Sequence, residues 1–334
     1  MNGKRNIILF VLAALLLASF QPDFVRRTRR GIIVTAKDTL VRAMEPFNGA
    51  PDGGAWYADA INKYDSLFGE NVRVYCMVIP TAVAYYCPDT ARMWSNHEQP
   101  TINSIYSHLS QRVVPIDVYG TLGRHKEEPI YSRTDHHWAP LGAYYAAREF
   151  AQAAEVPFRN LDSYDTLVIR NYVGTMYRFS GDIRVKQSPE EFTYYIPRDV
   201  DIRTTYTLYK LDKRRTRVIA QSEPEEGEFF REYPDGSNSA YLTFMGGDTR
   251  LTSIETSTQS SRRLLILKDS YGNALPAYLF YSFGQIHVAD CRYFTENICD
   301  YISRNQITDI LFANNLGHAY NVKTSQNYIK YLTQ

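Results

Sequence analysis

Short apolar runs that alternate with segments of helical periodicity place the strongest constraint on how this 334-residue chain can fold. Residues 72–79 (VRVYCMVI), 263–268 (RLLILK) and 307–313 (ITDILFA) each have the length and apolar content of a buried strand. Residues 140–154 and 294–305 instead favour helices. Strands and helices that alternate in this way form mainly parallel sheets, because a parallel crossover is long enough to contain a helix. The pattern therefore predicts an α/β fold in which helices flank a mainly parallel sheet.

Residues 165–245 follow a different pattern. Their stretches FTYYI (192–196) and TTYTLYK (204–210) are rich in β-forming residues, and Gly, Pro and Asp lie between such stretches. This arrangement is typical of antiparallel hairpins. Because the α/β pattern resumes afterwards, we interpret residues 31–334 as a single α/β domain that carries a β-rich insertion at about 165–245.

The first 30 residues indicate export. Lys4 and Arg5 precede an apolar run from Ile7 to Ala18, which is the pattern of a secretory signal. A membrane span needs about 20 apolar residues, more than this run provides. The sequence leaves open whether the segment is cleaved or retained. We therefore interpret residues 1–30 as a signal peptide or membrane anchor, and we expect a periplasmic or otherwise extracytoplasmic protein.

The overall composition excludes several classes of protein. The chain is 44% hydrophobic and 22% charged, so it can build a sizeable core and is not a disordered protein. Its 37 Lys and Arg residues against 36 Asp and Glu residues leave a net charge of +1, and no global positive field attracts nucleic acid. The four cysteines form no CxxC pair, which argues against a structural zinc site. We expect no nucleic-acid partner.

Two polar segments have the residue types that catalysis needs. RTDHHW (133–138) places Asp135 two residues before His137, so the carboxylate can fix the imidazole tautomer and leave the other ring nitrogen as a base. KDSYGN (268–273) follows directly after a predicted buried strand, and Ser270 is expected on the turn into a helix, near free backbone N–H groups. Both segments are expected beyond the carboxyl ends of strands, where sites form in open α/β sheets.

Neither signal is specific by itself. A serine that follows an aspartate at a helix start is commonly an N-cap residue. Asp135, His136 and His137 also fit a loop with a core histidine or a metal site, which leaves a metal-dependent phosphoesterase as an alternative function. The third ligand of a zinc site is unconvincing, because His125 lies in a polar stretch, and we predict no metal. The chain has no GxSxG elbow and no Gly-rich phosphate loop, and we predict no cofactor.

Taken together, the motifs resemble the DHHW family of bacterial exported proteins. That family is similar to the SGNH-hydrolase-like proteins that acetylate alginate outside the cytoplasm. The resemblance implies an SGNH-hydrolase-like α/β fold and extends from about Trp56 to Asn315. The segments that carry it are VYCMVIPTAVAYY, RTDHHW, YVGTMYRFSGD, MGGDTRL, KDSYGN and TDILFANN, in this order.

The resemblance also implies roles for individual residues. Ser270 is similar to the SGNH nucleophile, His137 to its base and Asp135 to the carboxylate that orients the base, although Lys268 stands where GDS-type enzymes have glycine. His136 remains the alternative base. The oxyanion-hole asparagine corresponds to Asn315 or Asn314, of which Asn315 is preferred. Apart from the resemblance, the aromatic content of the chain suggests a sugar-facing surface, and the residues that we expect to contact a glycan are Tyr85, Tyr271 and Trp138.

The function implied by these roles is that of an extracytoplasmic O-acetyltransferase or acetylesterase. It would act on a polysaccharide through a Ser-His-Asp triad and an acetyl-serine intermediate. An exported enzyme does not meet cytosolic acetyl-CoA, so a membrane-bound O-acyltransferase is the expected acetyl donor. The alternative from another class is a non-catalytic glycan-binding or polysaccharide-assembly protein on the same fold.

Overall fold

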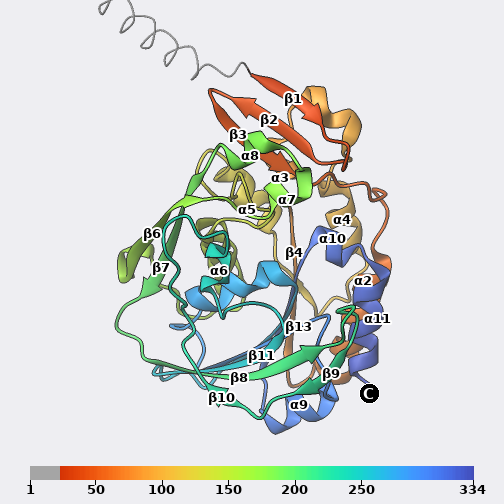
Figure 1. Ribbon diagram of the computed structural model, residues 1–334. Helices are drawn as coiled ribbons and strands as arrows, with labels where there is room; N and C mark the ends of the chain where they lie inside the picture. The colour runs from red at the N-terminus through yellow and green to blue at the C-terminus, as the bar shows by residue number, and fades with distance from the viewer. Residues whose placement is uncertain (1–22) are drawn as a thin grey trace, which may run out of the picture.

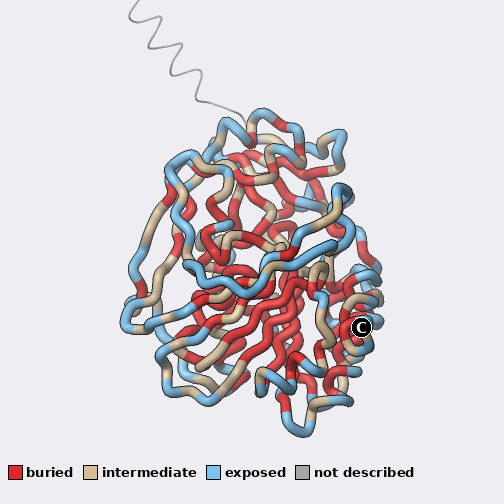
Figure 2. The backbone as a smooth tube through the Cα atoms, turned by 60° about the horizontal axis from the view of Figure 1, so that its bottom comes forward, coloured by how far each residue is buried: buried red, intermediate tan, exposed pale blue. Residues whose placement is uncertain are grey.

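The computed structural model describes residues 23–334, so most of the predicted export segment lies outside the described residues. Among residues 23–334, no helix has both the length and the apolar character needed to span a membrane. A nine-stranded sheet forms the centre of the described chain, in the order β10-β8-β11-β13-β12-β14-β4-β5, with β9 paired to β8 (Figure 1). Its central strands, residues 73–79, 263–268, 285–290 and 309–315, are almost entirely buried (Figure 2).

One half of this sheet is parallel and the other half is antiparallel. The parallel strands are β13 (Gln285–Asp290), β12 (Arg263–Lys268), β14 (Asp309–Asn315), β4 (Arg73–Ile79) and β5 (Val114–Pro115). The antiparallel strands are β11 (Arg250–Thr256), β8 (Ile202–Leu211), β9 (Val218–Gln221) and β10 (Glu225–Glu226). The α/β prediction is confirmed, with a large sheet that has a parallel centre and an antiparallel extension.

Helices cover both faces of the parallel half. On one face, Phe312 of β14 packs against Tyr64 and Tyr328 with ring centroids 5.0 Å apart in each pair. On the other face, Tyr75 of β4 packs against Phe150 at 5.1 Å. These rings come from opposite faces because successive side chains of a strand alternate. The helices that supply them are α2 (Ala55–Phe68), α6 (Pro140–Ala153) and α11 (Val322–Tyr331).

The antiparallel pairing expected in residues 165–245 is present, and part of it joins the large sheet. Strands β6 (Tyr164–Tyr172) and β7 (Glu190–Pro197) form a separate two-stranded antiparallel sheet, at the left of Figure 1. Strands β8, β9 and β10 instead extend the large sheet through β11. The alternating pattern predicts strands correctly, but it does not reveal which sheet they enter, because pairing depends on distant residues.

Two elements differ from the sequence-based expectation. The segment after β12 is a 3₁₀ helix, η4 (Ser270–Tyr278), where the sequence predicts a helix over residues 272–282. Pro276 lies inside it and lacks the N–H that an α-helical bond would need. Residues 24–44 form a three-stranded antiparallel sheet that the sequence patterns do not predict, made of β1 (Phe24–Arg27), β2 (Ile33–Lys37) and β3 (Leu40–Met44).

The three-stranded sheet packs on two short helices next to the DHHW segment. Val34 and Ala43 are buried in one small cluster with Met176 and Val185. The two helices are α7 (Met176–Ser180) and α8 (Ile183–Lys186). This packing fixes the residues immediately before α7, and one of them contacts Asp135.

Candidate active site

Ser270 lies where the central parallel strand β12 ends. Asp269 caps η4, because its carboxylate accepts the N–H of Tyr271 at 2.8 Å. The same carboxylate accepts the backbone N–H of Asn315 at 2.7 Å, at the end of the neighbouring strand β14. Asp269 therefore joins two strand ends and fixes the turn that presents Ser270. The predicted position at a carboxyl edge of the sheet is confirmed.

His137 bridges Asp135 and Ser270. Its Nδ1 lies 2.6 Å from Asp135 Oδ1, and its Nε2 lies 2.8 Å from Ser270 Oγ. Asp135 Oδ1 also accepts the backbone N–H of His137 at 3.1 Å, so the two-residue spacing orients both groups. His137 also stacks on Tyr241, with ring centroids 3.8 Å apart and planes 7° apart. Residues 133 positions apart in the sequence thus form one hydrogen-bonded series.

The far oxygen of Asp135 is held by the YVGTMYRF segment. Asp135 Oδ2 accepts the backbone N–H of Thr175 at 2.8 Å and its hydroxyl at 2.9 Å. Gly174 precedes Thr175, and a Cβ on Gly174 would lie 2.4 Å from the Asp135 side chain. Only glycine allows this close approach. The motif therefore supports the carboxylate from behind.

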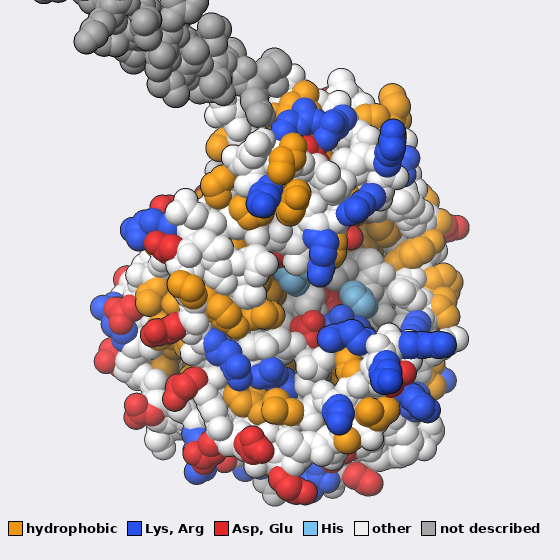
Figure 3. All heavy atoms as spheres, viewed as in Figure 1, with side chains coloured by type: hydrophobic (Ala, Val, Ile, Leu, Met, Phe, Trp, Pro, Cys, Tyr) orange, Lys and Arg blue, Asp and Glu red, His pale blue; other side chains and the backbone are white. Residues whose placement is uncertain are grey.

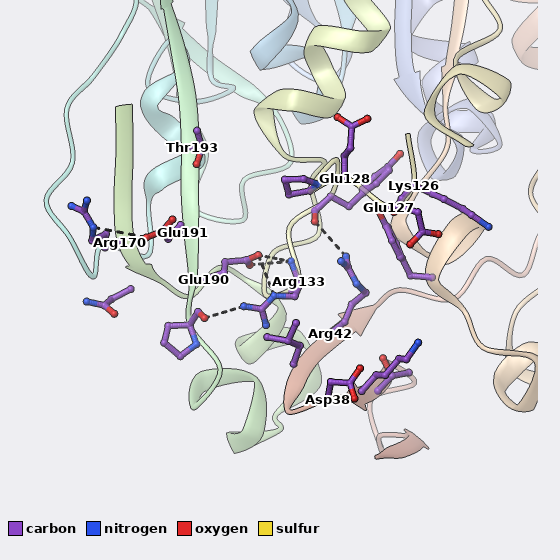
Figure 4. Close-up of a pocket in the computed structure, with 18 residues that line it drawn as sticks. Asp38, Arg42, Lys126, Glu127, Glu128, Arg133, Arg170, Glu190, Glu191 and Thr193 are labelled. Atoms are coloured by element: carbon purple, nitrogen blue, oxygen red, sulfur yellow. Dashed lines mark hydrogen bonds and ion pairs between the residues drawn. The ribbon is translucent and has the colours of Figure 1, made fainter. Parts of the chain in front are cut away.

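The loop before Asp135 is anchored at the edge of a large cavity (Figure 4). Glu190 accepts the backbone N–H of Arg133 at 2.8 Å and the backbone N–H of Thr134 at 2.7 Å. The Arg133 guanidinium donates to the carbonyl of Val41 at 3.0 Å and to Ser188 Oγ at 2.9 Å. The cavity has a volume of about 950 Å³, and neither His137 nor Ser270 lines it.

Charge and burial distinguish the two neighbouring histidines. Burial opposes the charged form of Asp135, yet the charge and hydrogen bond of His137 hold the pKa of Asp135 well below its usual range. Burial and the neighbouring His137 lower the pKa of His136 to about 3. His136 Nδ1 lies 2.6 Å from Thr175 Oγ1, and no hydrogen bond of His136 to Ser270 is found within residues 23–334. The geometry therefore favours His137 over His136 as the partner of Ser270.

The two asparagines at the end of β14 occupy different environments. Asn314 is completely buried, and its Oδ1 accepts the hydroxyl groups of Tyr57 and Tyr328 at 2.7 and 2.6 Å. Its amide nitrogen lies 3.3 Å from Asp269 Oδ2. Asn315 is partly exposed, and its Oδ1 caps the following short helix by accepting the N–H of His318 at 3.1 Å. Asn315 is therefore the better placed of the two for a ligand.

The aromatic residues expected to contact a glycan are mostly internal. Trp138 is completely buried and donates from Nε1 to the carbonyl of Tyr271 at 3.0 Å. Tyr271 is 2% exposed, and its hydroxyl donates to the carbonyl of His136. This burial corrects the expectation that Trp138 and Tyr271 face a glycan. Both side chains instead form hydrogen bonds inside the protein, and that of Tyr271 binds the segment that carries His137. Tyr85 is partly exposed and donates to the carbonyl of Tyr119 at 2.8 Å.

A partly buried ion network next to Ser270 is not predicted from the sequence. Lys268 Nζ lies 2.9 Å from Asp290 and 3.6 Å from Asp248. Arg292 contacts the same two carboxylates, at 2.7 and 3.0 Å. Although burial opposes its ionisation, Lys268 and Arg292 hold the pKa of Asp248 well below its usual range. The MGGDTRL motif is the signal, because Gly246 and Gly247 directly before Asp248 adopt positive φ angles of 71° and 118°.

One group of residues in the described chain has the donor atoms of a metal site. Asp135, His136 and His137 offer ligand atoms that all lie within 4.8 Å of one another. His125 does not belong to this group: its Nδ1 lies 2.5 Å from Glu128, and its ring stacks on Tyr145. The short contacts of His137 to Asp135 and Ser270 already engage both of its ring nitrogens.

The comparisons with known proteins decide the family. The DHHW protein family matches residues 53–289. A crystal structure of a DHHW family protein from Eubacterium siraeum is 38% identical, with a TM-score of 0.81, and the match covers 92% of this chain and 98% of that chain. This chain belongs to the DHHW family. The family resemblance seen in the motifs is thereby confirmed.

Among more distant proteins, Bacillus cereus PatB1 shares the fold of this DHHW protein. Bacillus cereus PatB1 is 20% identical with a TM-score of 0.66, over 88% of this chain and 99% of that chain. A second PatB1 structure carries a sulfonyl adduct and gives a TM-score of 0.67. The O-acetyltransferase domain of Pseudomonas putida AlgJ is 11% identical, with a TM-score of 0.47, over 92% of this chain and all of that chain. Among curated proteins, none matches the sequence.

Proposed function

We propose that this DHHW protein is an SGNH-hydrolase-like O-acetyltransferase or acetylesterase that acts on a polysaccharide outside the cytoplasm. The observation that carries the proposal is the series Asp135 Oδ1–His137 Nδ1 at 2.6 Å and His137 Nε2–Ser270 Oγ at 2.8 Å. A nucleophile, a base and a group that orients the base are the three parts that acyl transfer by serine requires. The Asp135-His137-Ser270 order of the chain does not matter, since the same geometry occurs with several orders.

The first half-reaction forms an acetyl-serine. His137 Nε2 accepts the Ser270 hydroxyl proton while Oγ attacks the carbonyl carbon of the acetyl ester. Asp135 keeps the Nδ1 proton in place and stabilises the imidazolium. When the tetrahedral intermediate collapses, the bond to the leaving alcohol breaks, and that alcohol takes the proton from His137. The acetyl group then remains on Ser270.

The oxyanion of the intermediate needs donors that are not already engaged. Within residues 23–334, no backbone acceptor engages the N–H of Ser270. The amide nitrogen of Asn315 is the second proposed donor, since only the oxygen of that side chain caps the next helix. One such donor contributes about 10²–10³ in rate. In the second half-reaction, His137 deprotonates a sugar hydroxyl or a water molecule, which attacks the acetyl-serine and releases Ser270.

The acetyl donor in this proposal is a membrane-bound O-acyltransferase that meets the exported domain. The sugar-facing aromatic residue is Tyr85, which is partly exposed. A metal-dependent phosphoesterase is the second candidate, because Asp135, His136 and His137 cluster within 4.8 Å. That candidate predicts loss of activity with a chelator and no requirement for Ser270. A glycan-binding protein without catalysis predicts no ester turnover at all.

The test is covalent labelling and turnover of the purified protein. We expect wild type to hydrolyse a small aryl acetate and to be labelled at Ser270 by a sulfonyl fluoride. Ser270→Ala should lose both, and Ser303→Ala, an exposed helix serine, should keep both. Turnover that survives Ser270→Ala but not a chelator would favour the metal enzyme. If the wild-type protein shows neither labelling nor turnover, the catalytic proposal is rejected in favour of a glycan-binding protein without catalysis.

A further inference from the structure

A second cavity of the described chain is lined by basic side chains without acidic ones. Its volume is about 510 Å³, and it lies among the β8–β9 turn, the segment after β13 and helix α11. No Asp or Glu residue lines it. Lys and Arg side chains gather in this region, beside a hollow that contains histidine side chains (Figure 3). We call this cavity the basic groove, and its basic residues are Arg215, Arg217, Arg292, His318, Lys323 and Lys330.

The order of the strands places the basic groove beside Ser270. Strand β12 lies between β13 and β14, and in register Lys268 pairs with Asp290 on one side and with Ala313 on the other. Three parallel strands therefore end at the same edge. Ser270 follows β12, Arg292 follows β13, and the chain after β14 leads to α11. Neighbouring strands are about 4.8 Å apart, so the groove and the nucleophile share one edge of the sheet.

Most of the cations in the groove are free to meet a ligand. Arg215, Arg217, Lys323 and Lys330 are exposed, and none of them forms an ion pair within residues 23–334. Arg292 differs, because Asp248 and Asp290 compensate its charge. The groove thus has a neutral inner side next to Ser270 and a positive outer rim.

Two carboxylates lie close in sequence to the groove residues and have partners of their own. Asp212 accepts the backbone N–H of Thr216 at 2.6 Å and its hydroxyl at 2.8 Å. These bonds hold the turn that presents Arg215 and Arg217. Glu296 is paired with Arg304 at 2.6 Å. The hydrogen bonds of Thr216 and the charge of Arg217 lower the pKa of Asp212, so Asp212 stays ionised and offsets part of the charge of Arg217. The uncompensated positive charge of the rim is that of Arg215, Lys323 and Lys330.

We propose that the basic groove binds a negatively charged polysaccharide, whose neighbouring sugar then reaches Ser270. The class of acceptor named here rests on the proposed acetyl chemistry at Ser270. The cations line a concave cavity, which suits a single chain better than the broad face of a membrane or a duplex. The whole protein has a net charge of only +1, so attraction of an anion depends on local charges such as those of this groove.

The test measures binding without chemistry. Full-length protein that carries Ser270→Ala is titrated with an oligogalacturonate of about ten residues and with its carboxyl-reduced, neutral counterpart. We expect the acidic oligomer to bind and the neutral one to bind at least about tenfold more weakly. Lys323→Glu with Lys330→Glu should weaken acidic binding by about tenfold or more, because two attractions become repulsions. The matched control is Lys37→Glu with Lys63→Glu, which makes the same charge change at exposed lysines outside the groove.

The remaining outcomes each overturn the proposal. Equal binding of acidic and neutral oligomers would assign recognition to sugar hydroxyl groups, and equal loss in the control pair would assign it to net charge. Binding to phosphatidylglycerol vesicles or single-stranded DNA, without binding to the oligogalacturonate, would assign the groove to another anion. Thermal unfolding of each double variant checks that the fold is retained. Because labelling of Ser270 is measured separately, failure of the groove and failure of the proposed chemistry give different results.

Discussion

The two halves of the candidate site are each bordered by a cavity, and the cavities differ in charge balance. The cavity next to the loop that precedes Asp135 and His137 is lined by five Lys or Arg residues and five Asp or Glu residues, and we call it the balanced cavity. The basic groove beside Ser270 is lined by five Lys or Arg residues and by no Asp or Glu residue. The two cavities have the same number of cations but differ in net charge. In the first cavity most of these cations have partners within the described chain, and in the basic groove most of them have none.

The difference separates charges that hold the fold from charges that are available to a ligand. In the balanced cavity, Glu190 binds three donors of Arg133 and Thr134, and the Arg42 guanidinium lies 3.8 Å from the ring centre of Tyr86. Such partly buried pairs add little net stability, but they fix one arrangement of the chain. In the basic groove, exposed cations keep their hydration until an anion arrives. Changes on the two sides should therefore affect different observables.

Loss of the base should have the largest effect on turnover. We expect His137→Ala to reduce acetyl-ester turnover by about 10⁴–10⁶-fold, because Ser270 then has no proton acceptor. The double variant with Ser270→Ala should be no worse than either single variant, since the residues act as a unit. Oligogalacturonate binding should stay within about twofold, because the groove cations are unchanged. Steady-state kinetics and titration measure the two quantities on the same preparations.

Two results would contradict this prediction. If the losses of the single variants multiply in the double variant, the two side chains act independently and no triad operates. If His137→Ala instead destroys oligomer binding, the two sides of the site are not separable, and the comparison of the cavities loses its meaning.

The orienting carboxylate should come next. Asp135→Asn keeps the size of the side chain but favours the wrong imidazole tautomer, which costs up to about 10⁴-fold in turnover. Because the pKa of Asp135 lies well below its usual range, the wild-type carboxylate stays ionised between pH 5 and 9, and its titration should add no step to the wild-type rate profile. A rate profile between pH 5 and 9 measures this. Activity close to wild type would show that Asp135 only supports the loop.

Much of this arrangement could be predicted from local sequence, and the rest depends on distant contacts. The apolar runs at 72–79 and 263–268 predict the central strands, and the two-residue spacing of Asp135 and His137 predicts their bond. The burial of Trp138 could not be predicted, because its pocket is built by Tyr241 and Tyr271, far away in the chain. The basic groove was missed for the same reason. Its cations come from three separate segments that only the sheet topology brings together.

A change in the balanced cavity should reduce turnover moderately. Glu190→Gln removes the negative charge next to Arg133 and puts an NH₂ group where Oε2 accepts the backbone N–H of Arg133. The loop before Asp135 therefore loses an acceptor and an ion pair. We expect a loss of about 1–3 kcal/mol in the free energy of unfolding and about a tenfold loss of turnover, without a change in oligomer binding. Glu191→Gln is the matched control, because its side chain is 65% exposed. Equal effects of the two variants would refute the anchoring role of Glu190.

The second histidine should matter least for turnover. His136 has a pKa of about 3, so it is neutral at the pH where an esterase would work, and it faces Thr175 instead of Ser270. We expect His136→Asn to keep turnover within about threefold, which is far from the loss expected for a base.

The low pKa of His136 also predicts how the free energy of unfolding depends on pH. Between about pH 3 and 6.5 the unfolded state binds a proton that the folded state does not, so stability falls as the pH is lowered through this window. His136→Asn should therefore lose less stability than wild type between pH 7 and 4, by on the order of 2 kcal/mol in denaturant titrations. A large loss of turnover together with an unchanged pH dependence of stability would reassign the base to His136 and reverse the roles of the two histidines.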